Sequence, residues 1–299
     1  MSFSFGRVGA KVSLRGVVFR RSGAYSIVLE GTRFDSRAIP CAVGSKAPWY
    51  FVLCPIEGEL RVGQRRILPN DVVVLPQHFV TVKGSPAFPI RSLSNEAHAV
   101  ALRVHPDDLA TLHMEPRVHE CSSATVTAIR ELSTALSSDA FQEAAVHAQR
   151  AATCLVGEGI TRQEPDSGGR TQVRASVVQR FARTVYPLLS ELTTKPGLAD
   201  VIEQAGVSER QFLRSMVRVQ ETFDLPDRGF RTAMVRWRAT AAALLASSSA
   251  LSLDEVAILA GYASPNAVHR AFRKFELPFP GMIQKLAHEA PGGDLPREL

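Results

Sequence analysis

The same short pattern occurs twice towards the C-terminus of this 299-residue chain. Each copy is a short segment with helical spacing of apolar residues, then a Gly, then a Ser that precedes a second amphipathic segment. The copies are residues 198–208 and 253–264. Gly readily takes the positive φ that ends a helix, and Ser can cap the helix that follows. The repeated pattern therefore predicts an all-α C-terminal domain with two helix-turn-helix units.

The segment after Ser264 divides into two faces when its residues are placed about 100° apart around a helix. An apolar face is formed by Ala267, Val268, Ala271, Phe272 and Phe275. The opposite face carries an amide, an imidazole and three cations, which are Asn266, His269, Arg270, Arg273 and Lys274. We expect the apolar face to pack on the preceding helix and the polar face to remain outside the protein.

The segment after Ser208 divides in the same way. Its predicted inner side consists of Phe212, Leu213, Met216, Val217 and Val219. Its predicted outer side consists of Arg210, Gln211, Arg214, Ser215 and Arg218. Arginines at i, i+4 and i+8 repel one another on an isolated helix unless an anion compensates their charge.

These two outer faces have the chemistry of helices that enter the DNA major groove. Asn pairs with adenine, Arg pairs with guanine, and flanking cations hold phosphates. The predicted base-reading residues are Arg210, Arg214, Asn266 and Arg270, with Gln211 and His269 beside them. The predicted phosphate contacts are Arg218, Arg273 and Lys274. One basic stripe on a helix is usually only a solvated face, but two stripes that each follow a helix and a Gly turn favour DNA binding.

Residues 230–246, between the two units, are rich in Ala and Leu and contain no Pro or Gly. This composition favours one continuous helix. Such a helix is about 25 Å long and could hold two reading helices about one DNA turn, or 34 Å, apart. The alternative is an ordinary core helix.

The chain from about Leu14 to Val104 consists of short β-type runs. The clearest runs are residues 49–54, 58–62 and 72–75. Gly63 and residues 69–71 between them have the composition of turns. Several short strands at close spacing predict an antiparallel barrel or sandwich.

Apolar residues return to helical spacing in residues 122–156, with a break at residues 137–139. The two predicted helices could pack on the barrel or pair with a second subunit. The polar segment that follows has no periodicity and predicts a linker. The expected organisation is a sensor domain (1–160), a linker (161–172), a DNA-binding domain (173–290) and a tail (291–299).

The C-terminal region, residues 173–289, resembles the DNA-binding domain of the AraC/XylS family of bacterial transcription regulators. Residues 253–274 and Pro280 carry the resemblance. The matching positions are Ala257, Gly261, Tyr262, Ser264, Arg270, Phe272 and Pro280. The resemblance implies two DNA-reading helices, although Ile202 stands where the family usually has a small Ala.

The N-terminal region resembles the cupin-type barrel with which many such regulators sense a small molecule. Residues 70–76 are similar to the second cupin motif, with Asn70 in place of its usual Gly. Catalytic cupins bind a metal through His and Glu side chains, but the corresponding positions here are near Gly44 and Lys46 and at Phe51 and Thr81. The resemblance therefore implies a cupin-like antiparallel β-barrel with no metal, no cofactor and no catalytic residue.

Three side chains of this region are candidates for contact with an effector. Trp49 and Phe51 share one strand face with Leu53, and His78 follows the turn at Pro76. Aromatic side chains often line a ligand pocket. Core packing for the strand residues and a solvated loop position for His78 are the alternatives.

The composition of the chain bears on nucleic-acid binding, membrane contact and zinc binding. The chain has 35 Lys and Arg against 29 Asp and Glu, a net charge of +6, which is too mild to predict nucleic-acid binding by itself. No apolar run approaches the roughly 20 residues of a membrane span, so no membrane contact is expected. The four cysteines form no C-x-x-C pair, which predicts a reduced, cytoplasmic protein without a zinc site.

The complete prediction is an α+β multidomain regulator of transcription. Its expected partners are double-stranded promoter DNA, an effector that is a small molecule or a protein, and RNA polymerase if the protein is an activator. A homodimer and a monomer both fit the apolar stripes. The alternative from another class is a cupin-like metal-dependent enzyme with a helical appendage.

Overall fold

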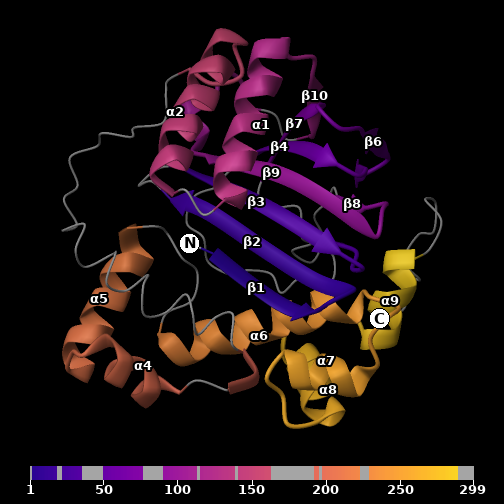
Figure 1. The fold of residues 1–299 in the computed structure, drawn as a ribbon, viewed down its shortest axis with the longest axis vertical. Helices are drawn as coiled ribbons and strands as arrows, with labels where there is room; N and C mark the ends of the chain where they lie inside the picture. The colour runs from indigo at the N-terminus through magenta and orange to yellow at the C-terminus, as the bar shows by residue number, and fades with distance from the viewer. Residues whose placement is uncertain are drawn as a thin grey trace.

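The computed structural model describes residues 2–18, 22–35, 50–76, 90–112, 115–138, 141–162, 192–194, 197–222 and 229–288. An N-terminal part of strands and two helices lies against a C-terminal part made of helices (Figure 1). No helix within these ranges is long and apolar enough to cross a membrane.

The N-terminal part contains two sheets. Its strands are β1 (Ser2–Arg7), β2 (Ala10–Val18), β3 (Ser22–Glu30), β4 (Tyr50–Glu57), β5 (Leu60–Val62), β6 (Arg65–Ile67), β7 (Val72–Pro76), β8 (Ile90–Ser92), β9 (Glu96–Val104) and β10 (Arg117–His119). The large sheet has the order β1-β2-β3-β9-β4-β7-β10 and the small one the order β6-β5-β8. The paired strands are antiparallel, as predicted.

Two details of the β-region differ from the prediction. The strands begin at Ser2 rather than near Leu14, because β1 pairs with β2 as a hairpin. The described strands also do not close into a barrel: β1 and β10 are free edges of the large sheet within the described ranges. The turn at Asn70 has a φ of 76°, a conformation that Asn tolerates better than most residues.

Each face of the large sheet has its own apolar core. Leu53 and Val73 of the large sheet pack with Leu60 of β5 and Ile90 of β8 in the core between the sheets. On the other face, the helices α1 (Ser123–Ser137) and α2 (Phe141–Gly157) cover the sheet (Figure 1). Ile129, Leu132 and Leu155 of these helices are buried against the sheet. Packing of the two helices on the sheet is therefore confirmed, whereas dimerisation stays a prediction.

The C-terminal part is built around one long helix. Its helices are α4 (Leu198–Ala205), α5 (Glu209–Thr222), α6 (Phe230–Ala246), α7 (Leu253–Leu259), α8 (Pro265–Lys274) and α9 (Pro280–His288). The bounds of α6 confirm the predicted continuous helix at residues 230–246. Helices α4 and α5 lie towards the N-terminal end of α6, and α7 and α8 lie towards its other end (Figure 1).

Candidate nucleic-acid interface

The first predicted unit consists of α4, a turn and α5. Gly206 ends α4 with a φ of 59°, and Ser208 precedes α5. The Ser208 hydroxyl accepts a hydrogen bond from the backbone N–H of Gln211 at 3.3 Å, and the Gln211 side-chain oxygen accepts one from the Ser208 N–H at 3.1 Å. This reciprocal capping satisfies two backbone donors at the start of α5. The side-chain oxygen of Gln211 therefore has a local partner, and its contact with a base remains a prediction.

Helix α5 buries a narrower face than the sequence predicts. Phe212 and Met216 are buried, and Phe212 meets Phe230 of α6 edge-on at 6.2 Å. Leu213 and Val217, predicted to face inwards, have exposed fractions of 36% and 48%. Among the described side chains of α5, the buried apolar ones therefore lie along the line through positions 212 and 216, and the two apolar side chains beside this line are exposed.

The predicted outer side of α5 is exposed at Arg210, Gln211 and Arg214. Arg210 and Arg214 lie one helical turn apart, so their side chains project from the same face. Arg218 belongs to the same helix, but its side chain lies outside the described residues. This face therefore presents at least two guanidinium groups to the solvent.

The second predicted unit consists of α7, a turn and α8. Ser252 and Glu255 form a capping box at the start of α7. Gly261 follows α7 with a φ of 76°, and a Cβ atom there would lie 2.1 Å from the carbonyl oxygen of Leu192. The turn therefore requires Gly both for its backbone conformation and for the close approach of another backbone segment.

The two predicted faces of α8 are confirmed. Val268 and Phe272 are fully buried, whereas the exposed side chains are Asn266, Arg270, Arg273 and Lys274. His269 is half-buried, and its ring lies 5.9 Å from that of Phe279. Ser264 occupies the N-cap position, but its hydroxyl makes no capping hydrogen bond, so the predicted cap is confirmed only by position.

Arg236 of α6 and Phe279 lie next to α8, although the sequence did not predict either of them as part of the interface. The Arg236 guanidinium of α6 lies 5.3 Å from the ring centroid of Phe275, and Lys274 Nζ lies 5.8 Å from the same centroid. Contacts of this type between a cation and an aromatic ring are attractive. Arg236 thus adds positive charge near the C-terminal end of α8. Phe279 lies beside the His269 ring. Arg236 and Phe279 lie outside the helical periodicity that identified the other candidates.

The turn of the second unit also contains buried polar groups. Burial raises the pKa of Tyr262 to about 12, so its hydroxyl stays protonated. Burial lowers the pKa of Arg238, which comes from α6. Tyr262 Oη and Arg238 Nε have no hydrogen-bond partner among the described residues. Arg238 is thus held inside the C-terminal part and does not belong to the exposed cationic faces.

The N-terminal part contains a cavity of about 100 Å³ between its two sheets. Its wall is formed by Ile27, Leu29, Phe34, Phe51, Leu53, Leu60, Ile90, Ala97, Ala99 and Ala101. Phe51, one of the three predicted effector contacts, is in this wall. Trp49 and His78 lie outside the described residues. In the described part of the chain, no group of three His, Cys, Asp or Glu side chains could hold a metal ion.

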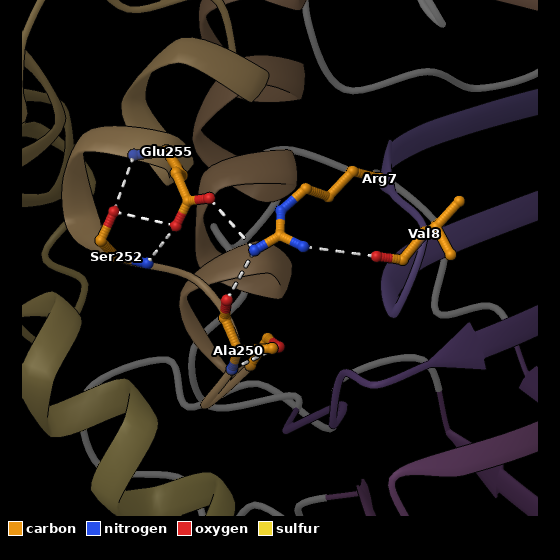
Figure 2. Close-up of polar contacts among 6 residues, drawn as sticks. Arg7, Val8, Ala250, Ser252 and Glu255 are labelled. Atoms are coloured by element: carbon orange, nitrogen blue, oxygen red, sulfur yellow. Dashed lines mark hydrogen bonds and ion pairs between the residues drawn. The ribbon is translucent and has the colours of Figure 1, made fainter.

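The two parts of the chain contact one another next to the second unit. Arg7, at the end of β1, donates hydrogen bonds from Nη2 to the Ala250 carbonyl oxygen at 2.8 Å and to Glu255 Oε1 at 3.1 Å (Figure 2). Ala250 precedes α7 in the chain, and Glu255 is in its first turn. The N-terminal part therefore contacts the start of α7 through Arg7.

Comparisons with known proteins give matches only among solved structures; no protein family and no curated protein matches the chain. A structure of ToxT from Vibrio cholerae is 12% identical, covers 88% of this chain and 98% of that chain, and has a TM-score of 0.35. The AraC-like transcriptional activator CuxR is 12% identical over 73% of this chain and 81% of that chain, with a TM-score of 0.33. At these values the comparisons assign neither a family nor a function.

Proposed function

We propose that this chain is a sequence-specific DNA-binding regulator of transcription of the AraC/XylS type. The observation that carries the proposal is the pair of amphipathic helices α5 and α8, each preceded by a short helix and a Gly turn. Both helices are buried on one face and present exposed cations on the other. Exposed arginines on a helix that projects from its domain suit the edges of guanine and the phosphates beside them.

In the proposed complex, each of the two helices enters a major groove. Arg210 and Arg214 of α5 and Asn266 and Arg270 of α8 read bases. The remaining cations, Arg218, Arg273 and Lys274, hold phosphates, and Gln211 and His269 lie at the edge of the contact. Helix α6 fixes the distance between the two reading helices.

We further propose that the N-terminal part is a cupin-like sensor. Two antiparallel sheets enclose an apolar cavity, and Phe51 is in its wall. An effector that binds one arrangement of the protein more tightly than another would shift the population towards that arrangement. RNA polymerase as a partner and homodimerisation stay predictions.

The test is selection of bound sequences from random double-stranded DNA by the full-length protein. We expect a selected site with two conserved segments whose centres are about one helical turn, or 34 Å, apart. Selection repeated with Arg210→Ala should relax one segment, and selection with Arg270→Ala should relax the other. Failure to enrich any sequence, or identical sites for both variants and the wild type, would refute the proposed function.

A further inference from the structure

The described residues that line the cavity in the N-terminal part are all apolar. None of their side chains carries a hydrogen-bond donor, an acceptor or a charge. A buried polar group without a partner costs about 1–3 kcal/mol by mutational measurements, so this wall disfavours charged or strongly polar groups. An apolar cavity of about 150 Å³ in another protein stays dry and binds benzene. The chemistry of the wall therefore selects a small, uncharged, apolar ligand or an apolar portion of a larger one.

One row of side chains runs from this cavity to the C-terminal part. Phe5 pairs with Val12, Val12 with Leu29, and Leu29 with Ala97 across four neighbouring strands. Directly paired residues project from the same face of a sheet. Leu29 and Ala97 belong to the cavity wall, whereas Val12 does not. We call these four residues the cross-strand row.

The other end of the cross-strand row contacts α6. The ring of Phe5 meets that of Trp237 edge-on, with centroids 5.7 Å apart and an interplanar angle of 85°. Residues of the row and buried residues of the C-terminal part, such as Met234 of α6, form one continuous apolar cluster. Close-packed side chains transmit displacements because little empty volume separates them.

A second connection joins the cavity wall to the end of α6. Phe34 is in the wall, and the backbone N–H of the preceding Arg33 donates a hydrogen bond to Ser247 Oγ at 2.9 Å. Ser247 is the C-cap residue of α6 and is buried. Arg7 holds the following segment through the Ala250 carbonyl oxygen (Figure 2). A change in the wall therefore reaches both α6 and the segment that leads to α7.

We propose that an uncharged, apolar ligand in the cavity changes the docking of the C-terminal part on the N-terminal part, and that the cross-strand row transmits the change. This inference rests on the proposed function only in taking the cavity as the effector site. The physical basis of the inference is that Leu29 and Ala97 belong both to the cavity wall and to the cross-strand row, whose Phe5 packs on Trp237.

The test uses full-length protein labelled with 5-fluorotryptophan and measured by ¹⁹F NMR in the absence of DNA. The chain has two tryptophans, and Trp237→Phe assigns the resonance of interest. Benzene is the probe ligand, and its binding is measured separately as a rise in the midpoint temperature of unfolding. We expect benzene to shift the Trp237 resonance.

Val12→Ala interrupts the cross-strand row without altering the cavity wall. In this variant we expect benzene to bind as in the wild type but the shift of the Trp237 resonance to be lost. Val100→Ala is the matched control, because Val100 is a buried residue of the same sheet that packs in the core beneath α1 and α2. It should retain the shift. Equal shifts in Val12→Ala and the wild type would overturn the role of the row.

A second probe fills the cavity without a ligand. Ala99 is in the wall but outside the cross-strand row, so Ala99→Val reduces the cavity from within. We expect this substitution alone to shift the Trp237 resonance. If neither benzene nor Ala99→Val shifts it, the proposal is overturned, including the case in which benzene does not bind. Selection of DNA by the same preparations reports the proposed function separately, so the two failures are distinguishable.

Discussion

Gly261 occupies a turn that a residue with a Cβ atom cannot enter without displacing its neighbours. Its φ of 76° disfavours other residues, and the Leu192 carbonyl oxygen fills the space of the missing side chain. Gly206, in the equivalent turn of the first unit, also has a positive φ, but a Cβ atom there would meet no atom within 4 Å. Substitutions at these two positions therefore distinguish the cost of the backbone conformation from the cost of steric overlap.

We expect Gly206→Ala to lower the free energy of unfolding by about 1–2 kcal/mol, the cost of the left-handed conformation. Gly261→Ala should lower the free energy of unfolding by about 1–3 kcal/mol more than Gly206→Ala, because the added methyl group overpacks the turn. Urea-induced unfolding of both variants measures the difference. Equal losses in the two variants would show that the backbone of Leu192 moves away freely.

Arg270 and Lys274 are exposed on the same helix, one turn apart, but their proposed roles differ. Arg270→Ala should weaken binding to the selected site by about 1–3 kcal/mol and relax specificity at one base pair. Lys274→Ala should weaken binding to all sequences evenly and reduce the salt dependence of binding by about one phosphate contact. Titrations against the selected site and its single-base variants at several salt concentrations distinguish the two effects. Even weakening by Arg270→Ala would contradict base reading.

One Ser residue precedes each of the two basic helices, so the two positions can be compared. The Ser208 hydroxyl caps α5 by accepting a hydrogen bond, whereas the Ser264 hydroxyl makes no such bond at the start of α8. Ser208→Ala should therefore lower the free energy of unfolding by about 0.5–2 kcal/mol. Ser264→Ala should change it much less, because Pro265 already fixes the first residue of α8. Urea unfolding measures both, and a larger loss for Ser264→Ala would reverse the assignment.

His98 joins three elements of the N-terminal part. Its Nε2 atom is hydrogen-bonded to Ser26 of β3 at 2.8 Å and to Ser133 of α1 at 2.9 Å. Burial lowers the pKa of His98, and the charge of Glu57 offsets this only in part. Between the lowered pKa and the ordinary value of about 6.5, the unfolded chain binds more protons than the folded one. Stability should therefore fall as the pH decreases through this interval.

The measurement is urea unfolding between about pH 7 and pH 5, the range in which His titrates. In His98→Gln the loss of stability with decreasing pH should be smaller, because the group that resists protonation is gone. An amide can still hydrogen-bond to the two hydroxyls, so the fold should be retained. An unchanged slope in this variant would assign the pH dependence to other groups.

Local sequence patterns predicted an element correctly where a single buried face determines its position in the fold. The bounds of α6 follow from an Ala- and Leu-rich composition without Pro or Gly, whereas both faces of α8 follow from the spacing of apolar residues. The same reasoning from spacing placed Leu213 and Val217 inside because it assumes that a helix is covered over its whole apolar side, whereas among the described side chains of α5 only Phe212 and Met216 are deeply buried. Strand β1 was missed although residues 2–5 alternate Ser and Phe, a period-two pattern that predicts a strand.

At the scale of the molecule, the contacts between the two parts had no signal in the sequence. Arg7 and Ala250 are 243 positions apart, and a lone Arg at the end of a strand resembles any surface cation. The sequence indicated the wall of the cavity only at Phe51 and at Leu53 on the same strand face, because its other members are common core residues whose inward orientation depends on the pairing of distant strands. Pairing of this kind is set by tertiary packing rather than by local preference.

The length of α6 leads to a prediction about the DNA site as a whole. Its 17 residues span about 25 Å and place the two basic helices at different ends of one stiff element. Because α6 cannot stretch, both helices can contact DNA only at one separation of their segments. Insertion of about half a helical turn of DNA, roughly 5 base pairs, between the two segments would move the second segment to the opposite side of the duplex.

We expect this insertion to reduce the affinity to that of a site with a single intact segment. Insertion of a full turn, about 10 base pairs, should have the same effect, because the second segment would then lie about 34 Å too far along the axis. Binding titrations with the three spacings, and with a site in which one segment is scrambled, make the comparison. Full affinity for the half-turn site would mean that only one of the two helices reads DNA, and α6 would then be an ordinary core helix.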